Sequence, residues 1–168
     1  MDKKFLAIIA FLTLGIIVLA VSITSFSKSD TKAVLSQIQG AKIKVDHTYK
    51  TVGDIGYSKG ILYHSFPIKN EGTQDLKIAN MTTSCMCTKV FLKTKKGEGP
   101  RFGMKGMTAP SSWTEVLKPG EDGEIIAAFD PAYHGPQGLG PVSRIVSFQT
   151  NDPDTPYIEL SFEGTVFK

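Results

Sequence analysis

The chain has 168 residues, and its 19 lysines and arginines against 16 aspartates and glutamates give a formal net charge of +3 at pH 7. This near balance excludes the strongly basic surface of a nucleic-acid-binding domain, so no nucleic-acid partner is expected. The length leaves room for one domain with a substantial core beside an apolar N-terminal segment.

That segment, Phe5–Phe26, contains no charged residue. As a helix, its roughly 22 residues would span about 33 Å, enough for the hydrocarbon core of a bilayer. Lys3 and Lys4 precede it, which predicts that the N-terminus lies inside and the rest of the chain on the extracytoplasmic side. We therefore expect residues 1–26 to form a cytoplasmic flank and a single transmembrane anchor. A cleaved signal peptide is the alternative, with Ala20-Val-Ser22 as a weak cleavage site.

Residues 27–40 are predicted to form a stalk between the anchor and the domain. Their sequence is polar, with a weak helical pattern at Val34, Leu35 and Ile38. A short helix and a flexible linker both fit this pattern. The remaining residues, 41–168, are expected to form one domain.

Alternating hydrophobic residues predict short β-strands throughout this domain. Runs of period two lie in 62–68, 76–80, 88–94, 125–129, 144–150 and 158–162. Turn-forming residues separate the runs, and Asp130 and Asp152 are expected to cap the backbone there. The pattern predicts an all-β fold, an antiparallel β-sandwich of immunoglobulin type with seven to nine strands. The residues expected to point inward are Phe66, Ile68, Ile78, Ile125, Phe129, Val146, Phe148, Leu160 and Phe162.

The order of the motifs resembles a bacterial family of unknown function, number 1573 in the domain-of-unknown-function series, which is similar to the Hydin-type immunoglobulin-like domains. The motifs that carry the resemblance are Phe66-x-Ile68-x-Asn70-x-Gly72, Ser84-Cys-x-Cys-Thr88, Lys118-Pro-Gly-Glu121, Phe129-Asp-Pro131, Thr150-Asn-Asp-Pro153 and Gly164-x-Val166. The resemblance covers roughly residues 52–167. It implies an immunoglobulin-like sandwich in a cell-surface or periplasmic setting and implies no established reaction. One departure is a long glycine-rich loop, expected at Lys93–Trp113.

The two cysteines, Cys85 and Cys87, are separated by one residue. In an extended strand they would point to the same face, with Cα atoms roughly 6.6 Å apart, near the upper limit for a disulfide. Three interpretations stay open: a soft-metal site, a local disulfide or redox pair, and simple packing. For the metal site, Met104 or Met107 would add a thioether and His134 an imidazole, and this donor set would select copper(I).

Other candidate residues have simpler interpretations. His64 lies on the apolar face of its predicted strand and is expected to be a core histidine, whereas His47 is expected to be exposed. Trp113 is either a core aromatic or an apolar lid over the cysteines. No hydrolase or phosphate-binding motif is present in the sequence. The expected function is therefore non-enzymatic: a membrane-anchored binding or assembly module with a protein partner in the envelope. The alternative is a copper-binding or thiol-redox protein of the cell envelope.

Overall fold

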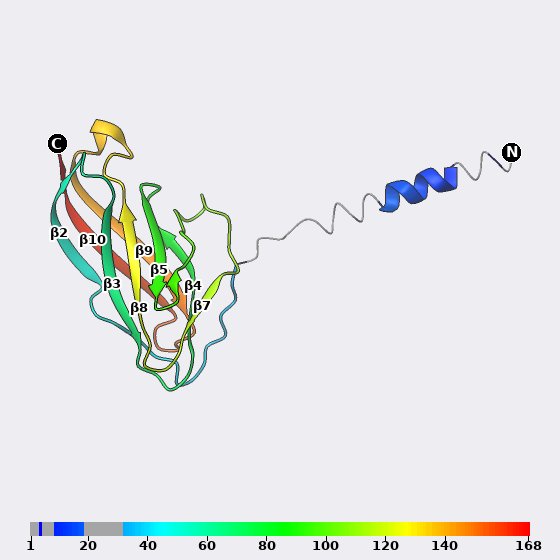
Figure 1. The fold of residues 1–168 in the computed structure, drawn as a ribbon, viewed down its shortest axis with the longest axis horizontal. Coiled ribbons are helices and arrows are strands. Elements are labelled where there is room, and N and C mark those ends of the chain that lie inside the picture. The colour runs from blue at the N-terminus through cyan, green and yellow to red at the C-terminus, as the bar shows by residue number, and fades with distance from the viewer. Residues whose placement is uncertain (1–3, 5–8, 19–31) are drawn as a thin grey trace. The chain divides into compact units, whose positions relative to one another are not determined.

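The computed structural model describes residues 4, 9–18 and 32–168 of the chain. The chain divides into two units, Met1–Asp30 and Thr31–Lys168. In the first unit, residues 9–18 are helical (Figure 1). Among the described residues, no helix has both the length and the apolar character needed to cross a membrane. The rest of the predicted anchor, residues 5–8 and 19–26, lies outside the described residues, as do residues 27–31 of the predicted stalk.

The second unit contains ten strands and one short 3-10 helix in its described part. The elements are β1 (Ile43–Val45), β2 (Tyr49–Gly56), β3 (Leu62–Asn70), β4 (Leu76–Thr83), β5 (Thr88–Thr94), β6 (Gly97–Glu98), β7 (Thr114–Leu117), β8 (Asp122–Phe129), η1 (Gly135–Gly138), β9 (Gly140–Thr150) and β10 (Tyr157–Phe167).

The strands form two five-stranded sheets, with orders β1-β3-β8-β5-β6 and β2-β10-β9-β4-β7 (Figure 1). This confirms the predicted sandwich, with two differences. β2 pairs in parallel with β10, so the second sheet is mixed rather than antiparallel. The number of strands exceeds the predicted seven to nine, because β1, β2 and β6 are short or largely exposed and lack the alternation by which strands are recognised.

The core lies between the two sheets, and it contains every residue that was predicted to point inward. Phe66, Phe148 and Leu160 are completely buried. Alternate residues of a strand point to opposite faces, so the period-two pattern places one face of each strand against the opposite sheet. Burial of these side chains is the main stabilising contribution to the sandwich.

The long loop predicted at Lys93–Trp113 is confirmed in part: residues 99–113 contain no strand, but the start of the segment and Phe102 pair with the first sheet. The first residues of this segment form a hairpin in which Lys93 pairs with Glu98. Phe102 then pairs with Val90 through two backbone hydrogen bonds of 2.8 and 2.9 Å and enters the core. Trp113 packs on Phe102 with ring centroids 5.4 Å apart and contacts the core, as a core aromatic does.

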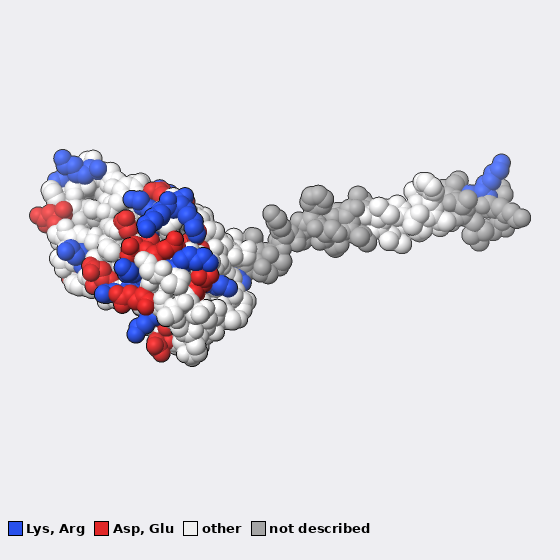
Figure 2. Space-filling view, turned by 60° about the horizontal axis from the view of Figure 1, so that its bottom comes forward, with Lys and Arg blue, Asp and Glu red and all other residues white. Residues whose placement is uncertain are grey.

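The described end of the predicted stalk contains no helix. Residues 32–38 run along the domain instead: the Ala33 N–H donates to the Ser111 carbonyl at 3.1 Å, and the Ile38 N–H donates to the Asn151 carbonyl at 2.9 Å. On the face of the domain shown in Figure 2, lysines and arginines lie among aspartates and glutamates. Lys93 on β5, for example, lies 3.9 Å from Glu124 on β8.

Candidate functional site: the cysteine turn

Cys85 and Cys87 lie in a tight turn, residues 84–87, which we call the cysteine turn. It carries the chain from β4 in one sheet to β5 in the other. Hydrogen bonds bend this segment, so the Cα separation given above for an extended strand does not apply to it. The Cys85 carbonyl accepts from the Thr83 hydroxyl at 2.8 Å and from the Thr88 N–H at 3.2 Å. The cysteine Cα atoms are therefore 5.3 Å apart, and the two sulfurs form a disulfide bond.

The two cysteines have different surroundings. Cys87 is 3% exposed and belongs to the hydrophobic core, whereas Cys85 is half-buried. The turn is also attached to β9, since Ser84 N–H donates to the Ile145 carbonyl at 2.9 Å and the Ser84 hydroxyl accepts from the Ile145 N–H at 3.0 Å. The pair is thus held on a rigid frame, with Cys85 as the more accessible sulfur.

Arg144 of β9 is a component of the site that was not predicted. Its Nε donates to the Cys87 sulfur at 3.1 Å, and its guanidinium lies over the Phe129 ring, 5.2 Å from the ring centre. Burial lowers the pKa of Arg144 from its ordinary value of 12.5, and the side chain remains cationic at neutral pH. The sequence contains a signal for this role. Arg144 alternates in step with the buried Val146 and Phe148, so a charged residue occupies a position that the period-two pattern assigns to the inward face of the strand.

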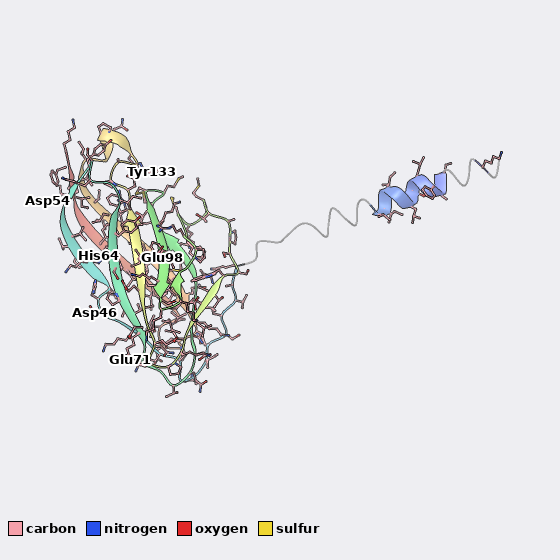
Figure 3. All side chains as sticks on the ribbon, viewed as in Figure 1. Asp46, Asp54, His64, Glu71, Glu98 and Tyr133 are labelled. Atoms are coloured by element: carbon pink, nitrogen blue, oxygen red, sulfur yellow. A yellow bond between two sulfur atoms is a disulfide. The ribbon has the colours of Figure 1, made fainter. Side chains whose placement is uncertain are left out.

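His134 reaches the cysteines from a distant part of the chain. The segment after β8 is attached to the turn because the Asp130 N–H donates to the Cys87 carbonyl at 2.8 Å. The Asp130 carboxylate then accepts from the Ala132 N–H at 2.9 Å, the capping role predicted for it. The resulting bend puts the exposed His134 just before η1, beside Tyr133, which Figure 3 labels. His134 Nε2 lies 3.4 Å from the Cys85 sulfur.

The ligand atoms of Cys85, Cys87 and His134 lie within 4.8 Å of one another. Of the five residues predicted for a metal site, these three converge in the structure. Met104 pairs through its backbone with Thr83, next to the cysteine turn, while Met107 is 64% exposed in the following loop. Among the described residues, neither methionine sulfur has a hydrogen bond to the cysteine pair.

Residues 43–98 match a family model described as Protein of unknown function (DUF1573). The family resemblance inferred from the motifs is confirmed over this segment. It runs from β1 to the β5–β6 hairpin and includes both cysteines, whereas His134 and Arg144 lie beyond it. No curated protein matches the sequence.

Among solved structures, the chain is similar to a protein of unknown function from Porphyromonas gingivalis W83, with a TM-score of 0.54 and 18% identity. The likeness covers 79% of this chain, which spans 50% of the other, and it supports the sandwich fold alone. The ASH/PapD-like domain 7 of human CEP192 shows 14% identity and a TM-score of 0.47, over 85% of this chain and 97% of that domain.

Proposed function

We propose that this chain is a non-catalytic, immunoglobulin-like binding module on the extracytoplasmic side of a membrane, and that it binds a soft metal ion, Cu(I), at the cysteine turn. The observation that supports this proposal is the convergence of two sulfurs and one imidazole nitrogen, from Cys85, Cys87 and His134, within 4.8 Å. Thiolate and imidazole donors at low coordination number suit Cu(I) better than harder ions.

Metal binding requires the reduced form of the pair. A dithiol reductant would transfer two electrons and two protons to the Cys85–Cys87 disulfide and would itself become a disulfide. Loss of the two thiol protons then gives two thiolates. The Arg144 guanidinium, 3.1 Å from the Cys87 sulfur, favours the anionic form by a charge-assisted hydrogen bond. The half-buried Cys85 and the exposed His134 provide the accessible side of the site.

The test is a titration of the reduced, full-length chain with Cu(I) against a chromophoric Cu(I) chelator. We expect one Cu(I) per chain, an affinity lower by about 100-fold or more in Cys85→Ser and by about tenfold in His134→Asn, and no binding to the oxidised chain. The variants Met104→Leu and Met107→Leu, titrated in the same way, test whether either thioether contributes to the Cu(I) affinity. Unchanged Cu(I) affinity in Cys85→Ser would contradict the proposal.

The membrane location is supported by the uncharged segment 5–26 and by Lys3 and Lys4 before it. Protease treatment of intact spheroplasts should therefore remove the domain and leave a short N-terminal fragment in the membrane. Full protection of the domain would contradict an extracytoplasmic location. A mature chain that begins near Ile23 would contradict the anchor and indicate a cleaved signal peptide.

A protein partner in the envelope is the second candidate ligand. The observation that favours it is β2, which lies at the edge of its sheet and exposes most of its side chains. Such an edge strand can add a strand from a partner. The metal content of the chain purified from cells separates the two candidates. Stoichiometric copper that disappears in Cys85→Ser favours the metal, and absence of copper from the wild-type chain purified in its reduced form counts against it.

A further inference from the structure

We infer a second metal site, independent of the cysteine turn, in which His47 Nε2 and His64 Nε2 bind one divalent cation of the zinc type. The two nitrogens lie 3.4 Å apart and come from different elements. His47 belongs to the segment that crosses from β1 in the first sheet to β2 in the second, and His64 lies on β3. In Figure 3, His64 is labelled on β3 and Asp46 in the crossing segment.

The distance between the rings suits a shared cation. Two nitrogens bound to a tetrahedral Zn²⁺ at about 2.0–2.1 Å each lie about 3.3–3.4 Å apart. In the structure the same two nitrogens form a long hydrogen bond of 3.4 Å. Their spacing therefore already matches the spacing that a shared tetrahedral cation requires.

Asp46 prepares His47 for this role. Its Oδ2 lies 3.0 Å from His47 Nδ1, so the carboxylate accepts a hydrogen bond from that ring nitrogen. This contact favours the tautomer with the proton on Nδ1, and the lone pair of Nε2 is then directed at His64. A carboxylate behind a histidine ligand is the usual outer partner of a metal-binding imidazole, because it orients the ring and raises its basicity.

Aromatic packing holds the His64 ring in place. Its ring packs edge-on against Phe66, with centroids 4.5 Å apart and planes at 87°, and also lies near Phe162, with centroids 6.2 Å apart. Burial, followed by the nearby charges of His47 and Lys50, lowers the pKa of His64 from 6.5. His47 is partly exposed, with 29% of its side chain accessible, so water can complete the coordination.

The experiment uses the oxidised, full-length chain in detergent, where the disulfide offers no thiolate. Competition with a fluorescent Zn²⁺ chelator should show one Zn²⁺ per chain. The affinity should fall by about tenfold or more in His47→Gln and in His64→Gln, and by a smaller factor in Asp46→Asn.

His134→Asn is the matched control, since it removes a histidine from the cysteine turn and should leave the Zn²⁺ affinity unchanged. His47 is partly exposed and its ring also contacts Phe66, with ring centroids 5.3 Å apart, so the unfolding transition of His47→Gln is measured alongside its Zn²⁺ affinity. A ¹⁵N spectrum of the imidazoles gives a second measurement, in which Zn²⁺ should shift the Nε2 signals of both histidines. No Zn²⁺ binding by the wild-type chain, or the same affinity in His47→Gln and His64→Gln, would overturn the inference.

Discussion

Asp152 shows how a single buried carboxylate connects separate parts of the sandwich. It is 1% exposed and lies in the turn between β9 and β10. Its carboxylate accepts hydrogen bonds from the Ile43 N–H at 2.9 Å, the Asp154 N–H at 2.9 Å and the Thr155 hydroxyl at 2.8 Å. Burial by itself would raise the pKa of Asp152, but these hydrogen bonds outweigh it and hold the pKa below 3.8. The capping role predicted for Asp152 is confirmed, and the bond to β1 extends it.

We predict that Asp152→Ala lowers the free energy of unfolding at pH 7 by about 3 kcal/mol, because three donors lose a charged acceptor and two of them are backbone groups. Urea unfolding monitored by circular dichroism measures the change. Asp154→Ala is the control: its exposed side chain should matter by less than about 0.5 kcal/mol. Equal losses in the two variants would show that the buried hydrogen bonds are not the cause.

The same carboxylate predicts a pH dependence. A lowered pKa in the folded state means that the unfolded chain binds the proton more tightly. The stabilisation by Asp152 is therefore complete above the ordinary value of 3.8 and is lost as the pH falls through the lower pKa of the folded state. In Asp152→Ala this part of the acid sensitivity should be missing, so the two unfolding curves should approach each other at low pH.

At the scale of elements, the parallel pairing of β2 with β10 depends on a close approach of two backbones. The register shifts between Glu163 and Gly164, where β10 opposes Gly53 of β2. A Cβ atom at Gly164 would lie 2.5 Å from the Gly53 carbonyl oxygen and 2.9 Å from side-chain atoms of Val52 and Ile55. Only glycine allows the two strands to pair at this position.

We predict that Gly164→Ala pushes β2 away from β10 and costs about 2 kcal/mol of stability. The damage should be local, so hydrogen exchange should accelerate in β2 while the amides of β3 and β8 stay protected. Thr165→Ala, at the adjacent exposed position, is the control and should leave exchange in β2 unchanged. Unaltered β2 exchange in Gly164→Ala would contradict the close approach.

At the scale of the whole molecule, the unit Thr31–Lys168 contains both sheets and the complete core between them. We predict that this unit, expressed alone, folds as a β-protein with one cooperative thermal transition, because the described residues of the hydrophobic core between the sheets all belong to it. Circular dichroism and calorimetry measure the transition. A chain that stays unfolded, or one with two separate transitions, would show that the unit requires residues before 31.

The sequence by itself determined the all-β class, the sandwich, the family resemblance and the inward residues. The physical reason is that side chains alternate along a strand, so burial of one face leaves a local period-two pattern, as in Phe66 and Ile68 or Val146 and Phe148. Turn residues such as Asp152 are also local signals. Cys85 and Cys87 were recognisable as a candidate site because only one residue separates them in the chain.

Only the tertiary structure decided which distant side chains lie beside Cys85 and Cys87. His134 was a candidate ligand from the sequence and Arg144 is a charge at an inward position, but no local pattern shows that they meet the cysteine turn. Strand register and the hydrogen bond from Asp130 to Cys87 bring them there. The same holds for His47 and His64, which were interpreted one by one and face each other because the chain changes sheets between them. Long-range contacts depend on how the two sheets are aligned, and that alignment results from the packing of the entire core.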